Sequence, residues 1–161
     1  MTIFVREPGE SSLPRRRALV AAAPKAHARV ARALSGFDVE FVRDLSSATA
    51  ALERGTFDVI VVGVYVLESR AIEVLRRLRV LAPSTAVICV RAAEPRYAMR
   101  GATLRAFRLA SEQLGACGLV DFLAYPDNRS GDASIQAAIE RLISRCPEGA
   151  RAKPSPRSES A

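Results

Sequence analysis

Two short segments of the chain are apolar at every position, and they constrain the fold more than any other feature. Val59–Val62 and Ala86–Val90 carry no polar side chain, which is typical of strands covered by helices on both faces of a parallel sheet. Ala18–Ala23 is a third run of this kind, and Leu119–Ala124 is a largely apolar fourth. Longer stretches with helical periodicity separate these runs. The alternation predicts βαβ units and therefore an α/β fold.

A fifth strand is predicted at Phe37–Val42, where apolar and polar residues alternate as they do in an edge strand with one wet face. The stretches between the strands predict five helices, over 24–34, 46–54, 71–81, 104–114 and 133–142, with Ser46 or Ser47 capping the second. A polar-edged second strand suits a three-layer, doubly wound, five-stranded parallel sheet of order 2-1-3-4-5. In that order, ligands bind beyond the carboxyl ends of strands 1, 3 and 4.

The length of the chain fits one domain with polar ends. The 161 residues are 49% apolar and 25% charged, which is ordinary for a single globular domain. We predict a flexible N-terminal tail over 1–16, one domain over 17–146 and a disordered C-terminal tail over 147–161, because both ends are too polar to form a core. Since only a tail follows the domain, we expect no output domain in the same chain.

The positive charge of the chain is concentrated in one stretch. The formal net charge is +7, and between Arg91 and Arg108 five arginines stand against Glu94 alone. No apolar run approaches the roughly 18–20 residues that a membrane span requires, so no membrane contact is predicted and a cytoplasmic location is the default.

The cysteines and the single histidine do not predict a metal site. Cys89, Cys117 and Cys146 are odd in number and far apart, so neither a disulfide framework nor a zinc site is expected. Cys89 is predicted to be buried in its strand, and Cys117 to be the most exposed thiol, with redox sensing as an open alternative. His27 is predicted to be structural. We therefore expect no metal and no other cofactor.

Two segments of the sequence resemble the response-regulator receiver family of bacterial two-component signalling. The first is FDVIVVGVYVLESRAIEVLRRLRVLAPSTAVICV, over 57–90, and the second is GLVDFLAYP, over 118–126. The resemblance covers nearly the whole predicted domain and follows the family's third strand, active-site loop, third helix, fourth strand and fifth strand. It implies a flavodoxin-like, chemotaxis-regulator-like receiver fold.

The resemblance also implies that the family's phosphorylation site is substituted throughout. The positions of its acid pair, nucleophilic Asp, hydroxyl residue and Lys fall on Ala22 and Ala23 (or Ala21 and Ala22), Gly63, Arg91 and Tyr125. Phosphoryl transfer to a carboxylate needs a nucleophilic oxygen, a divalent ion held by oxygen ligands and a cation that offsets developing charge. We therefore predict a pseudo-receiver without aspartyl phosphorylation and without enzymatic activity.

One further position of the family motif is retained. Pro126, which the family often holds in a cis peptide to end the fifth strand, is expected to have a structural role. Glu68, in the loop after the third strand, is a lone carboxylate and makes a poor magnesium site.

The predicted function is a phosphorylation-independent protein-interaction module. In receivers, the fourth helix, fifth strand and fifth helix form the usual partner and dimer surface, and here that region carries the charge excess. The candidate partner face consists of Arg100, Arg105, Arg108 and Glu112. Of these, Arg105, Arg108 and Glu112 lie opposite an apolar seam that is predicted to comprise Leu104, Phe107, Ala110 and Leu114. An acidic protein partner is expected, or a second copy of the chain, whereas nucleic acid is not favoured.

A second function remains open at this point. The crevice vacated by the substitutions could hold a small anion or a nucleotide, with Arg91 as the phosphate-binding cation and Gly63 leaving room. The other interpretation of Arg91 is a surface arginine that covers the emptied crevice.

Overall fold

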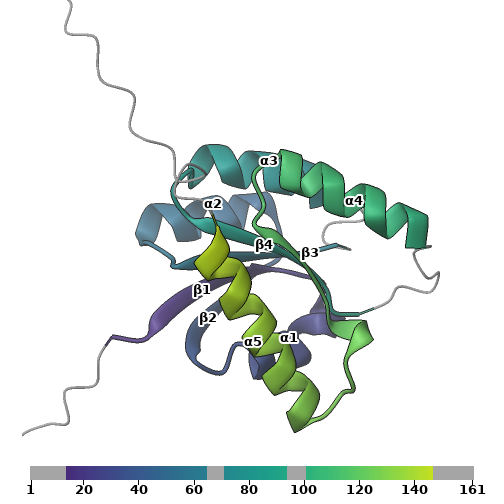
Figure 1. Ribbon diagram of the computed structural model, residues 1–161. Helices are drawn as coiled ribbons and strands as arrows, with labels where there is room; N and C mark the ends of the chain where they lie inside the picture. Colours follow the sequence, from purple (N-terminus) through teal and green to yellow (C-terminus); the bar gives the residue numbers. More distant parts are fainter. Residues whose placement is uncertain (1–13, 65–70, 94–100, 147–161) are drawn as a thin grey trace, which may run out of the picture.

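The computed structural model describes residues 14–64, 71–93 and 101–146 (Figure 1). It contains a five-stranded sheet of order β2-β1-β3-β4-β5, and all paired strands are parallel. The strands are β1 Arg16–Ala21, β2 Phe37–Val42, β3 Val59–Gly63, β4 Ala86–Arg91 and β5 Gly118–Asp121. The helices are α1 His27–Ala33, α2 Leu45–Arg54, α3 Ala71–Leu81, α4 Gly101–Gln113 and α5 Arg129–Arg145. The predicted fold class is confirmed.

The helices form two layers, one on each face of the sheet. Alternate residues of the three central strands point to opposite faces and divide the core into two apolar clusters. One cluster packs against α2, α3 and α4, and the other against α1 and α5, as Figure 1 shows. The residues of β3 are all buried, whereas β2 is buried only at Phe37 and Val42 and is partly or fully exposed between them. The prediction that the second strand lies at an edge is therefore confirmed.

Four of the five helix starts differ from the sequence interpretation. Helices α4 and α5 begin at Gly101 and Arg129, three and four residues before the predicted positions. The starts of α1 and α2 differ as well. A 3-10 turn, Pro24–Ala26, precedes α1, so the α-helix itself begins at His27. The cap of α2 is Asp44 and not a serine: its carboxylate accepts the N–H of Ser47 at 2.7 Å, and the Ser47 hydroxyl faces the Asp44 N–H at 3.3 Å. This reciprocal arrangement satisfies the amides of both Asp44 and Ser47, whereas a serine cap without such a partner satisfies only one amide.

The first and last strands also differ in length from the prediction. β1 begins at Arg16, one residue inside the predicted N-terminal tail. β5 ends at Asp121, because Phe122–Ala124 turn into a 3-10 helix whose first amides are capped by the Asp121 carboxylate, 3.1 Å from the Leu123 N–H.

The buried seam of α4 contains Ser111 and not Ala110. Leu104, Phe107 and Leu114 pack against the core as predicted, but Ala110 is exposed and Ser111 is fully buried. A spacing of seven residues returns close to the same side of a helix, whereas a spacing of six does not, so Ser111 lies nearer the line of Leu104. Its hydroxyl donates to the Arg108 carbonyl at 2.8 Å and is therefore satisfied.

The prediction that the cysteines form no disulfide is wrong. Cys117, directly before β5, is bonded to Cys146, directly after α5, with the Cα atoms 5.1 Å apart. The topology explains the pairing: parallel strands begin at one edge of the sheet, and the helix that follows the last strand returns to that edge. Cys89 is a free, buried thiol, as predicted. None of the described helices is long and apolar enough to cross a membrane.

Candidate functional site

The carboxyl ends of β1, β3 and β4 enclose a small apolar crevice. Of the residues singled out from the sequence, Ala22, Ala23 and Gly63 line it together. The remaining lining residues are Ala26, Val64, Val90, Ala92 and Ala93. Its volume is about 10 Å³, close to the least that holds one water molecule. Among the described residues, no carboxylate or hydroxyl lines the crevice.

Gly63 is held close to β1. A Cβ atom added at Gly63 would lie 3.2 Å from both the Cα and the Cβ of Ala22, closer than ordinary van der Waals contact. The glycine and the alanine therefore fit against each other, and a longer side chain at either position would require the strands to separate.

Arg91 points away from this crevice and binds Asp121. The guanidinium donates from Nε to one carboxylate oxygen at 2.9 Å and from Nη2 to the other at 2.6 Å. The two side chains are 15% and 19% exposed, so this two-pronged ion pair is largely screened from water. The residues face each other across the β4–β5 pairing. Asp121 was not singled out from the sequence. The signal that could have identified it is its position in β5, which pairs with the position of Arg91 in β4.

Tyr125 and Pro126 lie in the turn between β5 and α5. The Arg29 guanidinium donates to the carbonyl oxygens of Tyr125 at 2.9 Å and Pro126 at 3.2 Å, so α1 holds this turn. The Asn128 N–H donates to the Pro126 carbonyl at 3.0 Å. No described peptide bond is cis, so Pro126 differs here from the cis form that the family often has. These hydrogen bonds reverse the chain here with a trans peptide.

His27 and Cys89, which were also considered from the sequence, are part of the packing of the domain. The ring of His27 stacks on Phe41 with a centroid separation of 4.2 Å, and its Nε2 lies 3.0 Å from the Ala22 carbonyl oxygen. Burial raises the pKa of the Cys89 thiol to about 12, although a hydrogen bond with Ser111 acts in the opposite direction. A thiol with that pKa is protonated and unreactive at neutral pH.

A larger groove lies over the edge strand β5, between α4 and α5. Its volume is about 330 Å³. Its lining residues are Arg108, Leu119, Val120, Asp121, Ala124, Tyr125, Ala138, Arg141, Leu142 and Arg145, and we call it the basic groove. Tyr125 therefore lies at the groove and not in the crevice. Of the predicted partner face, Arg105, Arg108 and Glu112 are exposed on α4, whereas Arg100 lies outside the described residues.

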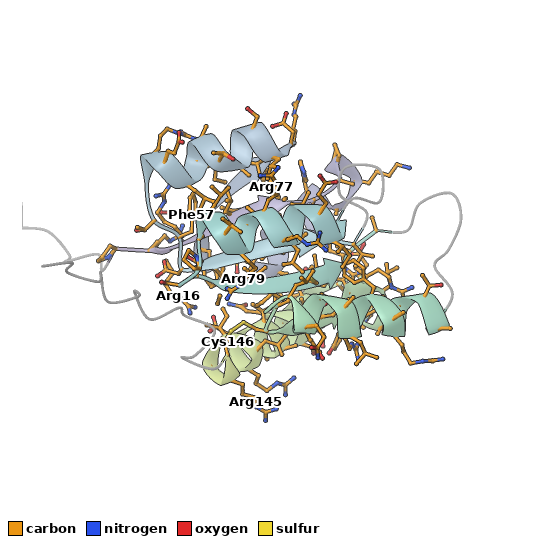
Figure 2. The ribbon with its side chains drawn as sticks, turned by 90° about the horizontal axis from the view of Figure 1, so that it is seen from above. Arg16, Phe57, Arg77, Arg79, Arg145 and Cys146 are labelled. Atoms are coloured by element: carbon orange, nitrogen blue, oxygen red, sulfur yellow. A yellow bond between two sulfur atoms is a disulfide. The ribbon has the colours of Figure 1, made fainter. Side chains whose placement is uncertain are left out.

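Three arginines of the basic groove lack counter-charges. Arg108, from α4, and Arg141 and Arg145, from α5, are exposed and form no ion pair with any residue in the described ranges. Arg145 lies at the outer end of α5 (Figure 2). The two arginines of α5 were missed from the sequence. Their spacing of four residues, which places them on one helix face beside Ala138 and Leu142, was the available signal.

The arginines near the amino ends of β1 and β3 are paired. Four ion pairs lie there: Arg15 with Asp38 at 3.8 Å, Arg17 with Glu40 at 3.4 Å, Arg54 with Glu40 at 2.6 Å, and Arg16 with Glu140. Arg16 and Phe57 mark this part of the molecule in Figure 2. The hydrogen bond from Glu140 raises the pKa of Arg16. These pairs are exposed, so each contributes little stability, but each offsets the charge of its arginine.

A hollow between α1 and the start of α5, of about 680 Å³, is also bridged by ion pairs. Arg32 donates from Nε to Asp132 at 2.8 Å and from Nη2 to Asp127. Both acids raise the pKa of the Arg32 guanidinium, Asp132 more strongly. Arg32, Asp127 and Asp132 are thus paired with one another, whereas Arg129, which also lines the hollow, has no ion pair among the described residues.

Comparisons with known proteins agree with this architecture. No protein-family model matches the chain, and no curated protein matches it in sequence. Solved structures do match. A response regulator from Thermotoga maritima is 19% identical with a TM-score of 0.61, covering 81% of this chain and 99% of that one. A CheY-like receiver domain protein from Methanospirillum hungatei is 16% identical with a TM-score of 0.58, covering 82% and 97%.

An orphan response regulator of H. pylori, HP1043, is 16% identical with a TM-score of 0.55, covering 81% of this chain and 99% of that one. The order of the sheet and the two helical layers define a flavodoxin-like α/β protein. The similar structures specify it further: the chain has the CheY-like receiver fold.

Proposed function

We propose that this receiver fold acts as a phosphorylation-independent protein-interaction module in bacterial two-component-type signal transduction. The observation that carries the proposal is the basic groove, in which α4 and α5 present Arg108, Arg141 and Arg145 without a counter-charge from any residue that the structure describes. Apolar side chains such as Leu119 and Leu142 lie between the arginines. A basic rim around an apolar floor fits a protein partner with an acidic surface.

Independence from phosphorylation is supported by the crevice at the carboxyl ends of the strands. The receiver family places its nucleophile at the position of Gly63, and the acids that hold magnesium at those of Ala22 and Ala23. Here these residues face one another across a space of about 10 Å³. A phosphoryl group bound to magnesium needs oxygen ligands and more room than this.

A homodimer through the same face is a less favoured arrangement. A second copy would bring Arg105 and Arg108 against an equally basic surface, and Glu112 alone offers a nearby opposite charge on that face of α4. Like charges brought together across an interface oppose association. An acidic partner avoids this repulsion, so a heterologous complex is the form that we propose.

The alternative function, a sensor of a small anion or nucleotide in the crevice, is not supported by the geometry. Both prongs of the Arg91 guanidinium are engaged by Asp121. A nucleotide also requires a pocket of some hundreds of cubic ångströms, far larger than the crevice. No second function is proposed.

The partner is tested by affinity capture with matched charge-reversal variants. The tagged protein is incubated with nuclease-treated native lysate, and bound proteins are identified by mass spectrometry. The Arg105→Glu, Arg108→Glu variant should lose the partner. The Arg76→Glu, Arg77→Glu variant changes the same charge on exposed positions of α3 and should retain it. Equal retention by both variants, or no partner for the wild-type chain, would contradict the proposal.

Phosphorylation is tested separately by intact mass. The chain is incubated with acetyl phosphate and Mg²⁺ beside a receiver that accepts phosphate from this donor. We expect no added phosphoryl group on this chain and unchanged partner capture after the treatment. A gain of one acid-stable or hydroxylamine-labile phosphoryl group would refute independence from phosphorylation.

A further inference from the structure

The disulfide joins the edge strand of the sheet to the end of the last helix. Cys117 is anchored in the sheet, because its N–H donates to the Val87 carbonyl of β4 at 2.7 Å. Cys146 is the C-terminal cap of α5, and its N–H reaches the Ile143 carbonyl at 3.3 Å. The Cα separation of 5.1 Å is normal for a disulfide. The bond therefore ties a helix end to a fixed point.

The end of α5 is less buried than the rest of the helix. The buried residues of α5 are Gly131, Ile135 and Ile139, all before its last six residues. Beyond them, Leu142 and Ile143 pack against the core but are only half-buried. Helix ends with so little buried surface fray at a low free-energy cost. The disulfide is thus the strongest link that holds residues 140–146 in place.

Two weaker contacts assist the disulfide. Leu142 packs on Gly118, where an added Cβ would lie 2.9 Å from the leucine Cδ2. Glu140 pairs with Arg16, but this ion pair is exposed to solvent and contributes little. Of the two, only the Leu142 contact lies in the last turn of the helix.

The same helix end forms one wall of the basic groove. Arg141, Leu142 and Arg145 line the groove from α5, whereas Arg108 lines it from α4. Any loss of order over residues 140–146 would therefore remove two of the three unpaired arginines from their positions. The redox state of the cysteines and the shape of the groove are linked through this segment.

We propose that Cys117 and Cys146 form a thiol–disulfide switch that sets the order of the end of α5 and, with it, the α5 wall of the basic groove. The consequence for partner binding rests on the function proposed above. On reduction, two glutathione thiols supply two electrons and two protons, the S–S bond breaks, two cysteine thiols form, and the two glutathione molecules are joined in one disulfide. In the oxidised chain the α5 wall of the groove is ordered and binds the acidic partner, whereas the reduced chain binds this partner more weakly.

The structure favours exchange at this pair of cysteines over the third one. Cys117 and Cys146 are half-buried, so small thiols have partial access to their sulfur atoms. Cys89 is fully buried and lies in β4. It does not compete for exchange, because exchange requires an accessible thiolate.

The switch is tested on the full chain by hydrogen exchange in oxidised and reduced glutathione. Alkylation and peptide mass mapping establish the state of each cysteine. On reduction, we expect amides of residues 140–146 to exchange about tenfold faster, while 132–139 and the strands are unchanged. The Cys117→Ser, Cys146→Ser variant should resemble the reduced chain in both buffers, and Cys89→Ala should keep the response. Trypsin should cleave the double-serine variant faster after Arg141 and Arg145.

Three results would overturn the switch: equal exchange over 140–146 in the two states, failure of the disulfide to form in oxidised glutathione, or loss of protection throughout the domain on reduction. The captured partner is then tested in both buffers, and equal retention would refute the link to the groove. Absence of any partner in either buffer would refute the proposed function instead, while the exchange data would still decide the switch.

Discussion

Returning a side chain to position 63 is the most direct perturbation of the crevice. An added Cβ would lie 3.2 Å from two atoms of Ala22, one of them a backbone Cα that cannot rotate away. Forcing an extra carbon into a closely packed site costs about 1–3 kcal/mol. For a domain of about 130 residues, we expect Gly63→Ala to lower the Tm by about 4–10 °C.

Gly63→Asp should cost more than Gly63→Ala, and the difference should depend on pH. The carboxyl group would lie among Ala22, Val64 and Val90, and burial there raises the pKa of a carboxyl group above its unfolded value of about 3.9. Between the unfolded and folded pKa values, the folded chain binds more protons than the unfolded chain. The stability of the Asp variant therefore falls as pH rises through that window, by about 1.4 kcal/mol for each unit of difference.

The assay is urea unfolding followed by far-ultraviolet circular dichroism at pH 4 and pH 7. Gly36→Ala is the control, because its added Cβ would meet only the Gln136 amide nitrogen, at 3.7 Å. The midpoint of the control should move little. An Asp variant as stable as wild type at pH 7, or one that accepts phosphate from acetyl phosphate, would refute the assignment of a closed, apolar crevice.

Two further predictions concern the starts of α5 and α2. Gly131→Ala should destabilise the chain by about 2–3 kcal/mol, because its Cβ would lie 1.8 Å from the Pro126 carbonyl oxygen. The control Gly36→Ala should change the stability by no more than about 0.5 kcal/mol. Equal shifts of the Tm in the two variants would contradict this prediction. Hydrogen bonds from Ser47 lower the pKa of Asp44, so its stabilising effect is present above the unfolded pKa and is lost as pH falls through the folded one. Asp44→Asn should weaken that acid dependence while keeping the cap, as measured by urea midpoints between pH 5 and pH 2.

The sheet was predictable because local patterns carry most of its information. The wholly apolar β3 and the alternating β2 could be placed from composition alone, and β2 and α3 have the predicted limits. The prediction that Ala110 belongs to the buried seam of α4 was wrong. Ala110 was preferred because its side chain is apolar, although Ser111 lies closer to the line of Leu104 around the helix. The Asp44 cap was missed because it depends on a reciprocal contact with Ser47 that spacing suggests but does not require.

The basic groove and the disulfide depend on contacts between distant parts of the chain. Cys117 and Cys146 are 29 residues apart and become neighbours only because α5 returns to the edge where β5 begins. Asp121 forms an ion pair with Arg91 because β4 and β5 are paired, and this ion pair holds Arg91 outside the crevice. Such contacts follow from the topology once it is known. Counting cysteines or charges along the sequence does not reveal them.

The pairing of arginines at the amino ends of the strands also affects how a partner arrives. Arg15, Arg16, Arg17 and Arg54 are matched by nearby acids, whereas Arg108, Arg141 and Arg145 form no ion pair among the described residues. The positive charge left at the basic groove attracts a negatively charged surface before contact. Encounters at low ionic strength are then productive more often than random collisions. Added salt should slow association while leaving dissociation nearly constant.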